Sequence, residues 1–112
     1  MSEPRLSAKF WVQAYIRLCE TRTIPAMVVR HGDDLAGTVL IKLYQHGIGS
    51  TVFERTVDMD GNRAWMRATG ADPVPEFEAD EFIRKQAKFD PDLWVVEVES
   101  RDGSHLLTDP IV

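Results

Sequence analysis

The 112-residue chain has the length of one domain, and its 44% hydrophobic and 28% charged residues match a globular protein, which excludes a disordered chain. Its net charge of −5 disfavours nucleic acid as a partner, because affinity for the phosphate backbone is built from clustered Lys and Arg. No apolar run approaches the roughly 20 residues of a membrane span, and the single Cys19 excludes an internal disulfide, so we expect a cytoplasmic protein.

One domain is expected over residues 1–112, ordered from about residue 5 to about residue 108. Its first element is a helix from Ser7 to about Thr21, because Ser7 is a good N-cap and neither Gly nor Pro occurs before Pro25. Only one narrow stripe of this helix is polar: Lys9, Gln13, Arg17 and Glu20. The remaining apolar arc exceeds the roughly 100° that a surface helix buries, so this helix needs cover on more than one side.

Four short strands are predicted after the helix, each bounded by residues that favour turns. Their ranges are Ala26–His31, Gly37–Gln45, Ser50–Val57 and Arg63–Thr69. Glycine occurs in every connection, and Asp60-Gly61 between the last two strands is a strong hairpin signal. We therefore expect the four strands to form an antiparallel meander.

A second helix is predicted at about Glu76–Phe89, with acidic residues at its start and basic residues at its end, as the helix dipole favours. Its apolar face is narrow, which is typical of a surface helix on a sheet. A strand at Leu93–Ser100 follows, in which Trp94 alternates with charged positions and is expected in the core. Asp102-Gly103 then predicts a hairpin turn into a final strand at His105–Thr108.

These elements define an α+β fold in the order α-β-β-β-β-α-β-β. The predicted architecture is a curved, mostly antiparallel sheet packed with two helices. The pairing of strands beyond the hairpins is left open by the sequence.

Metal and cofactor motifs are not expected to be present. Asp58–Asn62 superficially resembles a calcium loop, but the glycine comes too early and Thr69 stands where an EF-hand needs glutamate. A hairpin turn explains these residues better. The three histidines are far apart, and Cys19 lies on the wide apolar arc of the first helix, where a thiol is buried and unreactive.

Four carboxylates are concentrated near the last strand: Asp90, Asp92, Glu97 and Glu99. Two of them could form an acid and base pair if their environments drove their pKa values apart. The simpler interpretation assigns the aspartates to turns and caps and the glutamates to the outward face of the strand.

Arg63, Trp65 and Arg67 share one face of a predicted strand. An aromatic ring between two guanidinium groups can bind an anionic or planar ligand, with Glu97 as a further ligand-binding candidate. Alternatively, Trp65 packs under a helix while the arginines cover its rim or pair across the sheet with Glu97 and Glu99.

The sequence also resembles a known family, and four stretches carry the resemblance: Trp11–Tyr15, Ala26–Asp33, Trp65–Arg67 and Phe89–Glu99. It is similar to the bacterial domain of unknown function numbered fourteen ninety-one, found mainly in alphaproteobacteria, over about Arg5 to Leu107. The resemblance implies a bacterial cytoplasmic protein. It supplies no catalytic residue, substrate or partner.

The leading hypothesis is a small non-enzymatic binding or interaction domain that forms a homodimer. Phe10, Ala14 and Leu18 are the predicted self-association residues, because they lie on the arc of the first helix farthest from Val12 and Cys19. One alternative is a small-molecule enzyme or anionic-ligand-binding protein that uses the Arg63/Trp65/Arg67 face. Nucleic-acid binding is a third alternative.

Overall fold

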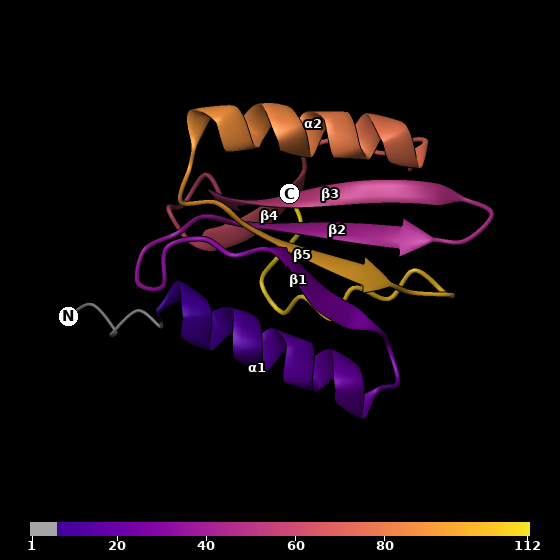
Figure 1. The fold of residues 1–112 in the computed structure, drawn as a ribbon, viewed down its shortest axis with the longest axis horizontal. Coiled ribbons are helices and arrows are strands. Elements are labelled where there is room, and N and C mark those ends of the chain that lie inside the picture. Colours follow the sequence, from indigo (N-terminus) through magenta and orange to yellow (C-terminus); the bar gives the residue numbers. More distant parts are fainter. Residues whose placement is uncertain (1–6) are drawn as a thin grey trace.

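Two helices cover opposite faces of a five-stranded sheet in the computed structural model, which describes residues 7–112 (Figure 1). The elements are α1 (Ala8–Thr21), β1 (Ala26–Arg30), β2 (Val39–Gln45), β3 (Gly49–Val57), β4 (Arg63–Arg67), α2 (Glu76–Phe89) and β5 (Trp94–Glu99). The α+β class and both helices are therefore confirmed. Ser7 caps α1 as predicted, since its Oγ accepts a hydrogen bond from the Phe10 backbone at 3.1 Å.

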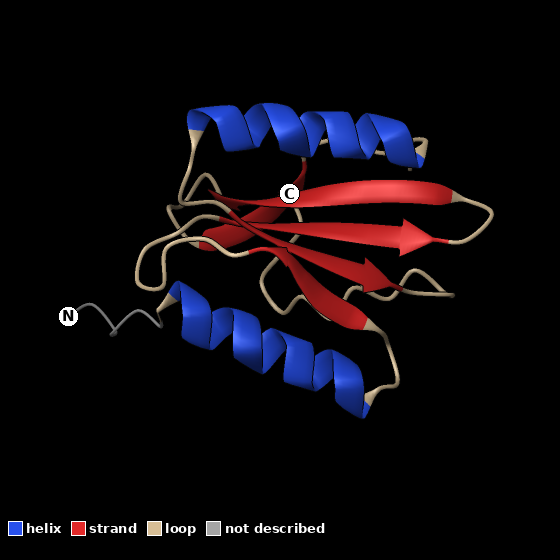
Figure 2. Ribbon diagram, in the orientation of Figure 1, coloured by secondary structure: helices blue, strands red, loops and turns tan. Residues whose placement is uncertain are grey.

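The sheet is mixed, and its strand order is β1-β5-β2-β3-β4. Strands β2, β3 and β4 form an antiparallel meander as predicted, but the expected pairing of β1 with β2 is wrong, because β5 lies between them and runs parallel to β2 (Figure 2). The glycines after β1 form no hairpin turn. Gly32 and Gly37 instead let the chain pass closely around the start of β5, where a Cβ on either would overlap the carbonyl oxygen of Asp92.

The predicted final strand at His105–Thr108 is also wrong. Strand β5 is paired with β1 on one side and with β2 on the other, so it has no edge left for a hairpin partner. The chain turns beneath α1 instead, where the Tyr15 hydroxyl donates to the His105 carbonyl at 2.7 Å. It then runs past the predicted ordered end at about 108 to place Ile111 beside Trp65, while residue 5 lies outside the described residues.

The larger core lies between α1 and the sheet. It contains Ala8, Val12, Tyr15, Cys19, Val39, Ile41, Phe53, Trp65, Trp94, Val96 and Val98. Trp94 and Cys19 are both buried, which confirms their predicted places in the core, and burial raises the pKa of the Cys19 thiol.

The smaller core lies under α2 and contains Leu40, Val52, Ala79, Leu93 and Val95. Helix α2 covers mainly β2 and β3, so the opposite end of this face, at β1, lies outside its cover (Figure 1). Neither α1 nor α2, the helices of residues 7–112, is long and apolar enough to cross a membrane.

Candidate functional site

Trp65, the centre of the predicted ligand-binding face, is a core residue with 1% of its surface exposed. Its ring centroid lies 5.5 Å from that of Trp11 on α1. The Arg55 guanidinium lies 4.4 Å from the Trp65 centroid, and Arg55 Nη1 donates to Asp109 Oδ2 at 2.6 Å. The indole is thus covered by a helix, a cation and the end of the chain.

Arg63 and Arg67 remain exposed on either side of Trp65. The Arg67 guanidinium lies 5.7 Å from the Phe53 ring, where it covers the rim of the core. A ligand at this face would meet the guanidinium groups and not the buried indole. Binding of a ligand by these residues stays a prediction.

Glu97, the fourth predicted ligand residue, lies on the other face of the sheet, under α2. Strands β2 and β3 separate β5 from β4, so the alternative prediction that Arg67 pairs with Glu97 or Glu99 is wrong. The Glu97 carboxylate instead approaches Lys42 of β2, with Oε2 at 3.9 Å from Nζ. The structure therefore does not bring Arg63, Trp65, Arg67 and Glu97 together.

Lys42 forms an ion-pair network that sequence reasoning missed. Its side chain is 4% exposed, and Nζ lies 2.8 Å from Glu76 Oε2 and 2.7 Å from Asp80 Oδ1, both on the first turns of α2. Burial acts to lower the pKa of Lys42, but the bonds to Asp80 and Glu76 outweigh it and the pKa is raised. The sequence signal was the carboxylate pair spaced four residues apart at a helix start.

Asp90 and Asp58 each accept hydrogen bonds from backbone groups of their own turns. Asp90 Oδ1 accepts from the Asp92 backbone at 3.1 Å, which fits the predicted turn role. Asp58 Oδ1 accepts from the backbones of Asp60 and Asn62, and the predicted β3 to β4 hairpin is confirmed. Within residues 7–112, no group of three or more His, Cys, Asp or Glu side chains is placed to hold a metal ion.

The open edge, which we define as the side of β1 away from β5, carries exposed apolar residues. Met27 is 61%, Val28 36% and Val29 50% exposed. The Glu99 backbone donates a hydrogen bond to the Pro25 carbonyl, and Met27 is paired with Glu97 in the same register. Backbone groups alternate in direction along an antiparallel strand. Those of Pro25 and Met27 therefore point toward β5, and those of Ala26 and Val28 point away from it. No other part of the described chain pairs with this side.

The closed edge, the side of β4 away from β3, is covered by the end of the chain. The Trp65 backbone donates to the Pro110 carbonyl at 2.8 Å and accepts from the Val112 backbone at 2.8 Å. These bonds satisfy the backbone groups that an edge strand otherwise leaves free.

The predicted self-association residues of α1 lie on its outer side. Phe10 is 57% exposed, Ala14 is exposed and Leu18 is half-buried, whereas Val12 and Cys19 are buried. Their placement on the arc farthest from the core is as predicted. Their role in an interface stays a prediction.

Comparison with known proteins found one matching family and several similar solved structures. A family model described as "Protein of unknown function (DUF1491)" matches residues 6–108. A crystal structure of a DUF1491 family protein from Caulobacter crescentus CB15 is 38% identical, has a TM-score of 0.87, and is matched over 96% of this chain and 100% of that chain. An NMR structure of a DUF1491 family protein from the same organism is 38% identical, has a TM-score of 0.85, and is matched over 98% and 99%.

A solution structure of a protein from A. tumefaciens shares the fold at 24% identity, with a TM-score of 0.78 over 95% of each chain. No curated protein matches the sequence. The similarity therefore extends over nearly the whole fold.

Proposed function

The chain belongs to the DUF1491 family, and from its geometry we propose that it is a non-enzymatic interaction domain that self-associates through the open edge of β1. The observation that carries the proposal is the run Met27-Val28-Val29, three consecutive exposed apolar residues on a strand with one unpaired side. Such an edge is a template for another strand, because its N–H and C=O groups are free to pair. The cytoplasm is the compartment we propose, where the unpaired Cys19 thiol stays reduced.

A second copy of the chain is the occupant that this edge suits. Antiparallel pairing about a two-fold axis at Val28 sets each Val28 against its own copy and brings Met27 near the partner's Val29, so that apolar residues meet apolar residues. Arg30, the one charged residue of β1, is held by its own chain, since Nη2 donates to the Pro91 carbonyl at 3.3 Å. It therefore presents no like charge at the centre of the contact.

The edge is also short. Strand β1 has five residues, and a bulge interrupts its register between Val28 and Arg30. Pro25, just before the strand, has no N–H to donate. A bulge twists an edge and shortens the length that can pair, and stable interfaces bury at least about 1,200 Å² in total. We therefore propose a weak, concentration-dependent dimer, not an obligate one.

The outer side of α1 is the competing surface. Phe10, Ala14 and Leu18 would give a helix-to-helix contact of the kind predicted from the sequence. The exposed apolar residues of α1 lie one helical turn apart on a stripe whose backbone is hydrogen-bonded within the helix, whereas those of β1 accompany backbone groups that point away from β5. This difference favours β1.

Sedimentation velocity from about 10 µM to about 1 mM tests the proposal, a range that detects the weak dimers expected of small interfaces. The weight-average mass of the wild type should rise with concentration, whereas Val29→Lys should stay monomeric. Val57→Lys is the matched control, because Val57 is 62% exposed on β3 beside the hairpin, away from β1. Urea unfolding should show that both lysine variants keep wild-type stability within about 0.5 kcal/mol.

A wild type that is monomeric at about 1 mM overturns the proposal. Dimerisation that survives Val29→Lys but is lost in Leu18→Glu assigns the interface to α1 and overturns the β1 assignment.

A further inference from the structure

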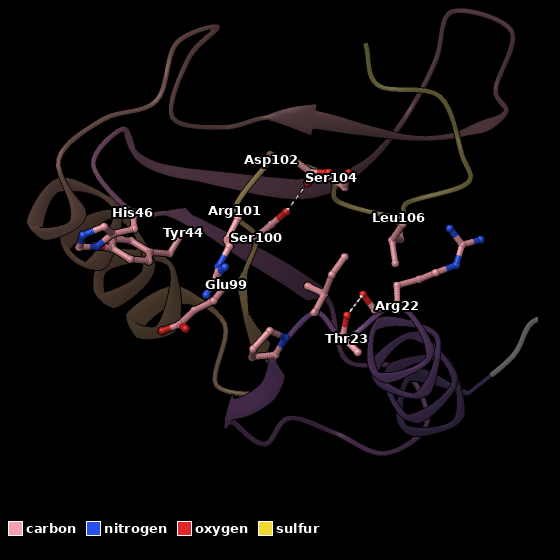
Figure 3. A pocket seen from close by; sticks show the side chains of 12 residues that line it. Arg22, Thr23, Tyr44, His46, Glu99, Ser100, Arg101, Asp102, Ser104 and Leu106 are labelled. Carbon is pink, nitrogen blue, oxygen red and sulfur yellow. Dashed lines mark hydrogen bonds between the residues drawn. The ribbon is translucent and has the colours of Figure 1, made fainter.

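A groove of about 1130 Å³ opens at the carboxyl ends of β2 and β5. These two strands are parallel neighbours, and their chains then leave in different directions: β2 turns back into β3, and β5 continues into the exit segment, residues 100–106. In open α/β sheets, ligands bind at the carboxyl ends of neighbouring parallel strands whose chains diverge, and the groove has the corresponding position in this mixed sheet. The connection from α1 to β1, residues 22–25, and the exit segment form walls of the groove (Figure 3).

The exit segment is held in one conformation by its own hydrogen bonds. Asp102 Oδ1 accepts from the Ser104 backbone at 2.9 Å and from Ser100 Oγ at 3.2 Å. The bond from Ser104 lowers the pKa of Asp102, and both bonds engage this carboxylate inside its own loop. Gln45 Nε2 donates to the Arg101 carbonyl at 3.0 Å. Because the exit segment is already ordered, little conformational entropy would be lost from it when a ligand binds.

Part of the groove is apolar and strained. Ile24, Pro25 and Leu106 line it, and Leu106 has a φ of 56°, which leucine rarely adopts. The conformation is held from the preceding residue, because the His105 carbonyl accepts from the Tyr15 hydroxyl. Strained residues that the surrounding structure maintains are concentrated at ligand sites.

Two guanidinium groups line the same groove. Figure 3 shows that Arg22 comes from the end of α1 and Arg101 from the exit segment. Neither arginine forms an ion pair with any carboxylate of residues 7–112. The end of a helix favours a cation in its own right, so Arg22 alone would not indicate a ligand. Two guanidinium groups together with an apolar lining give the groove the groups that bind a carboxylate or phosphate with an apolar body.

We propose that this groove binds a small organic anion, with a carboxylate or phosphate on a guanidinium group of Arg22 or Arg101 and an apolar body against Leu106 and Ile24. The carboxylates of Glu99 and Asp102, which also line the groove, disfavour polyanions by like-charge repulsion and so favour a single anionic group. The site is separate from the exposed side chains of the open edge.

NMR titration of the labelled protein with benzoate and with phenyl phosphate, each to about 10 mM, tests this proposal. Amide shifts should move in residues 22–24 and 99–106 with at least one probe. Benzoate alone would identify carboxylates as the ligand class, and phenyl phosphate alone would identify phosphate monoesters. Inorganic phosphate, which lacks an apolar body, and benzyl alcohol, which lacks a charge, should each bind at least about fivefold more weakly.

Arg22→Gln or Arg101→Gln should weaken binding about tenfold or more, while Arg17→Gln, at an exposed arginine of α1 that does not line the groove, should leave it unchanged. The variant that loses binding locates the anionic group. The proposal is overturned if neither probe moves these amides, or if neither groove variant weakens binding in a protein whose spectrum shows the native fold.

Discussion

At the closed edge of the sheet, the end of the chain lies along β4, whereas at the open edge the backbone groups of Ala26 and Val28 point outward along β1. The closed edge has two backbone hydrogen bonds to Trp65, and a 2.6 Å ion pair joins Arg55 to Asp109 on the same segment. The open edge has exposed apolar side chains instead. One edge of the sheet is thus hydrogen-bonded to the end of the chain, and the other edge is exposed.

This difference shows that the chain can cover an edge strand and does so only at β4. Pairing at β1 is limited by the short length of the strand, by its bulge and by the proline that precedes it. These features shorten the stretch that can pair but add no charge at its centre. The contrast predicts that changes at the closed edge alter folding stability, while changes at the open edge alter association.

Trp65→Ala should have the largest effect. The indole is buried against Trp11 and Arg55, so its loss should lower the free energy of unfolding by about 3–5 kcal/mol. Met27→Ala, on the open edge, should cost less than about 1 kcal/mol because the side chain is 61% exposed. Urea unfolding of the two variants measures both values. Similar losses in the two variants would mean that the edges do not differ as described.

Removal of residues 109–112 should lower the free energy of unfolding by about 2 kcal/mol, because two backbone hydrogen bonds and the Arg55 to Asp109 pair are lost. The shortened chain should also self-associate more strongly, since β4 would then have a free edge. Light scattering at matched concentrations checks the second effect. Unchanged association would argue that covering β4 has no role in preventing pairing.

Thr23→Gly should raise the free energy of unfolding by about 1 kcal/mol. Thr23 follows α1 with a φ of 55°, and its backbone donates to Glu20 while that of Ile24 donates to Cys19, a helix end that normally carries glycine. The change lies between α1 and β1, so it should leave self-association as it is. Thermal unfolding together with sedimentation tests both statements, and a lower melting temperature would contradict the first.

Protonation of His105 at acid pH should lower the free energy of unfolding, and this should be the smallest of the four effects on stability. Burial, with a contribution from Arg67, lowers the pKa of His105 below its ordinary value of 6.5. The unfolded chain therefore binds the proton more readily, so stability is full above pH 6.5 and declines as the pH falls through that value toward the folded pKa.

His105→Asn keeps an acceptor near the position that now accepts from the Leu107 backbone at 2.9 Å. The variant should lose part of the decline in unfolding free energy between about pH 7.5 and pH 5. An unchanged pH profile would exclude His105 as its source.

The sequence predicted what local physics determines. The Ser7 cap of α1, the periodicity of α1 and α2, the Asp60-Gly61 hairpin and the alternation around Trp94 were all confirmed. Strand order was not predictable, because the insertion of β5 between β1 and β2 depends on contacts between residues that are far apart in the chain. The error about the final strand follows from that insertion.

The predicted ligand residues failed to converge for the same reason. The alternation within each strand shows which residues share a face with Trp65 or with Glu97. Whether those two faces lie on the same side of the sheet depends on how the strands are ordered and paired. Cover of Trp65 by Arg55 was equally hidden, since an arginine in an alternating strand reads as solvent-facing. The open edge could not be identified until the sheet order was known.

Amide hydrogen exchange at two protein concentrations tests the central claim most directly. Between about 20 µM and about 1 mM, exchange of the Ala26 and Val28 amides should slow by about tenfold or more, because pairing of β1 with a second copy satisfies these outward-facing groups. Amides of α1 should exchange at the same rate at both concentrations. If β1 exchange does not depend on concentration, or if new protection is found on α1 alone, the open edge is not where the protein associates.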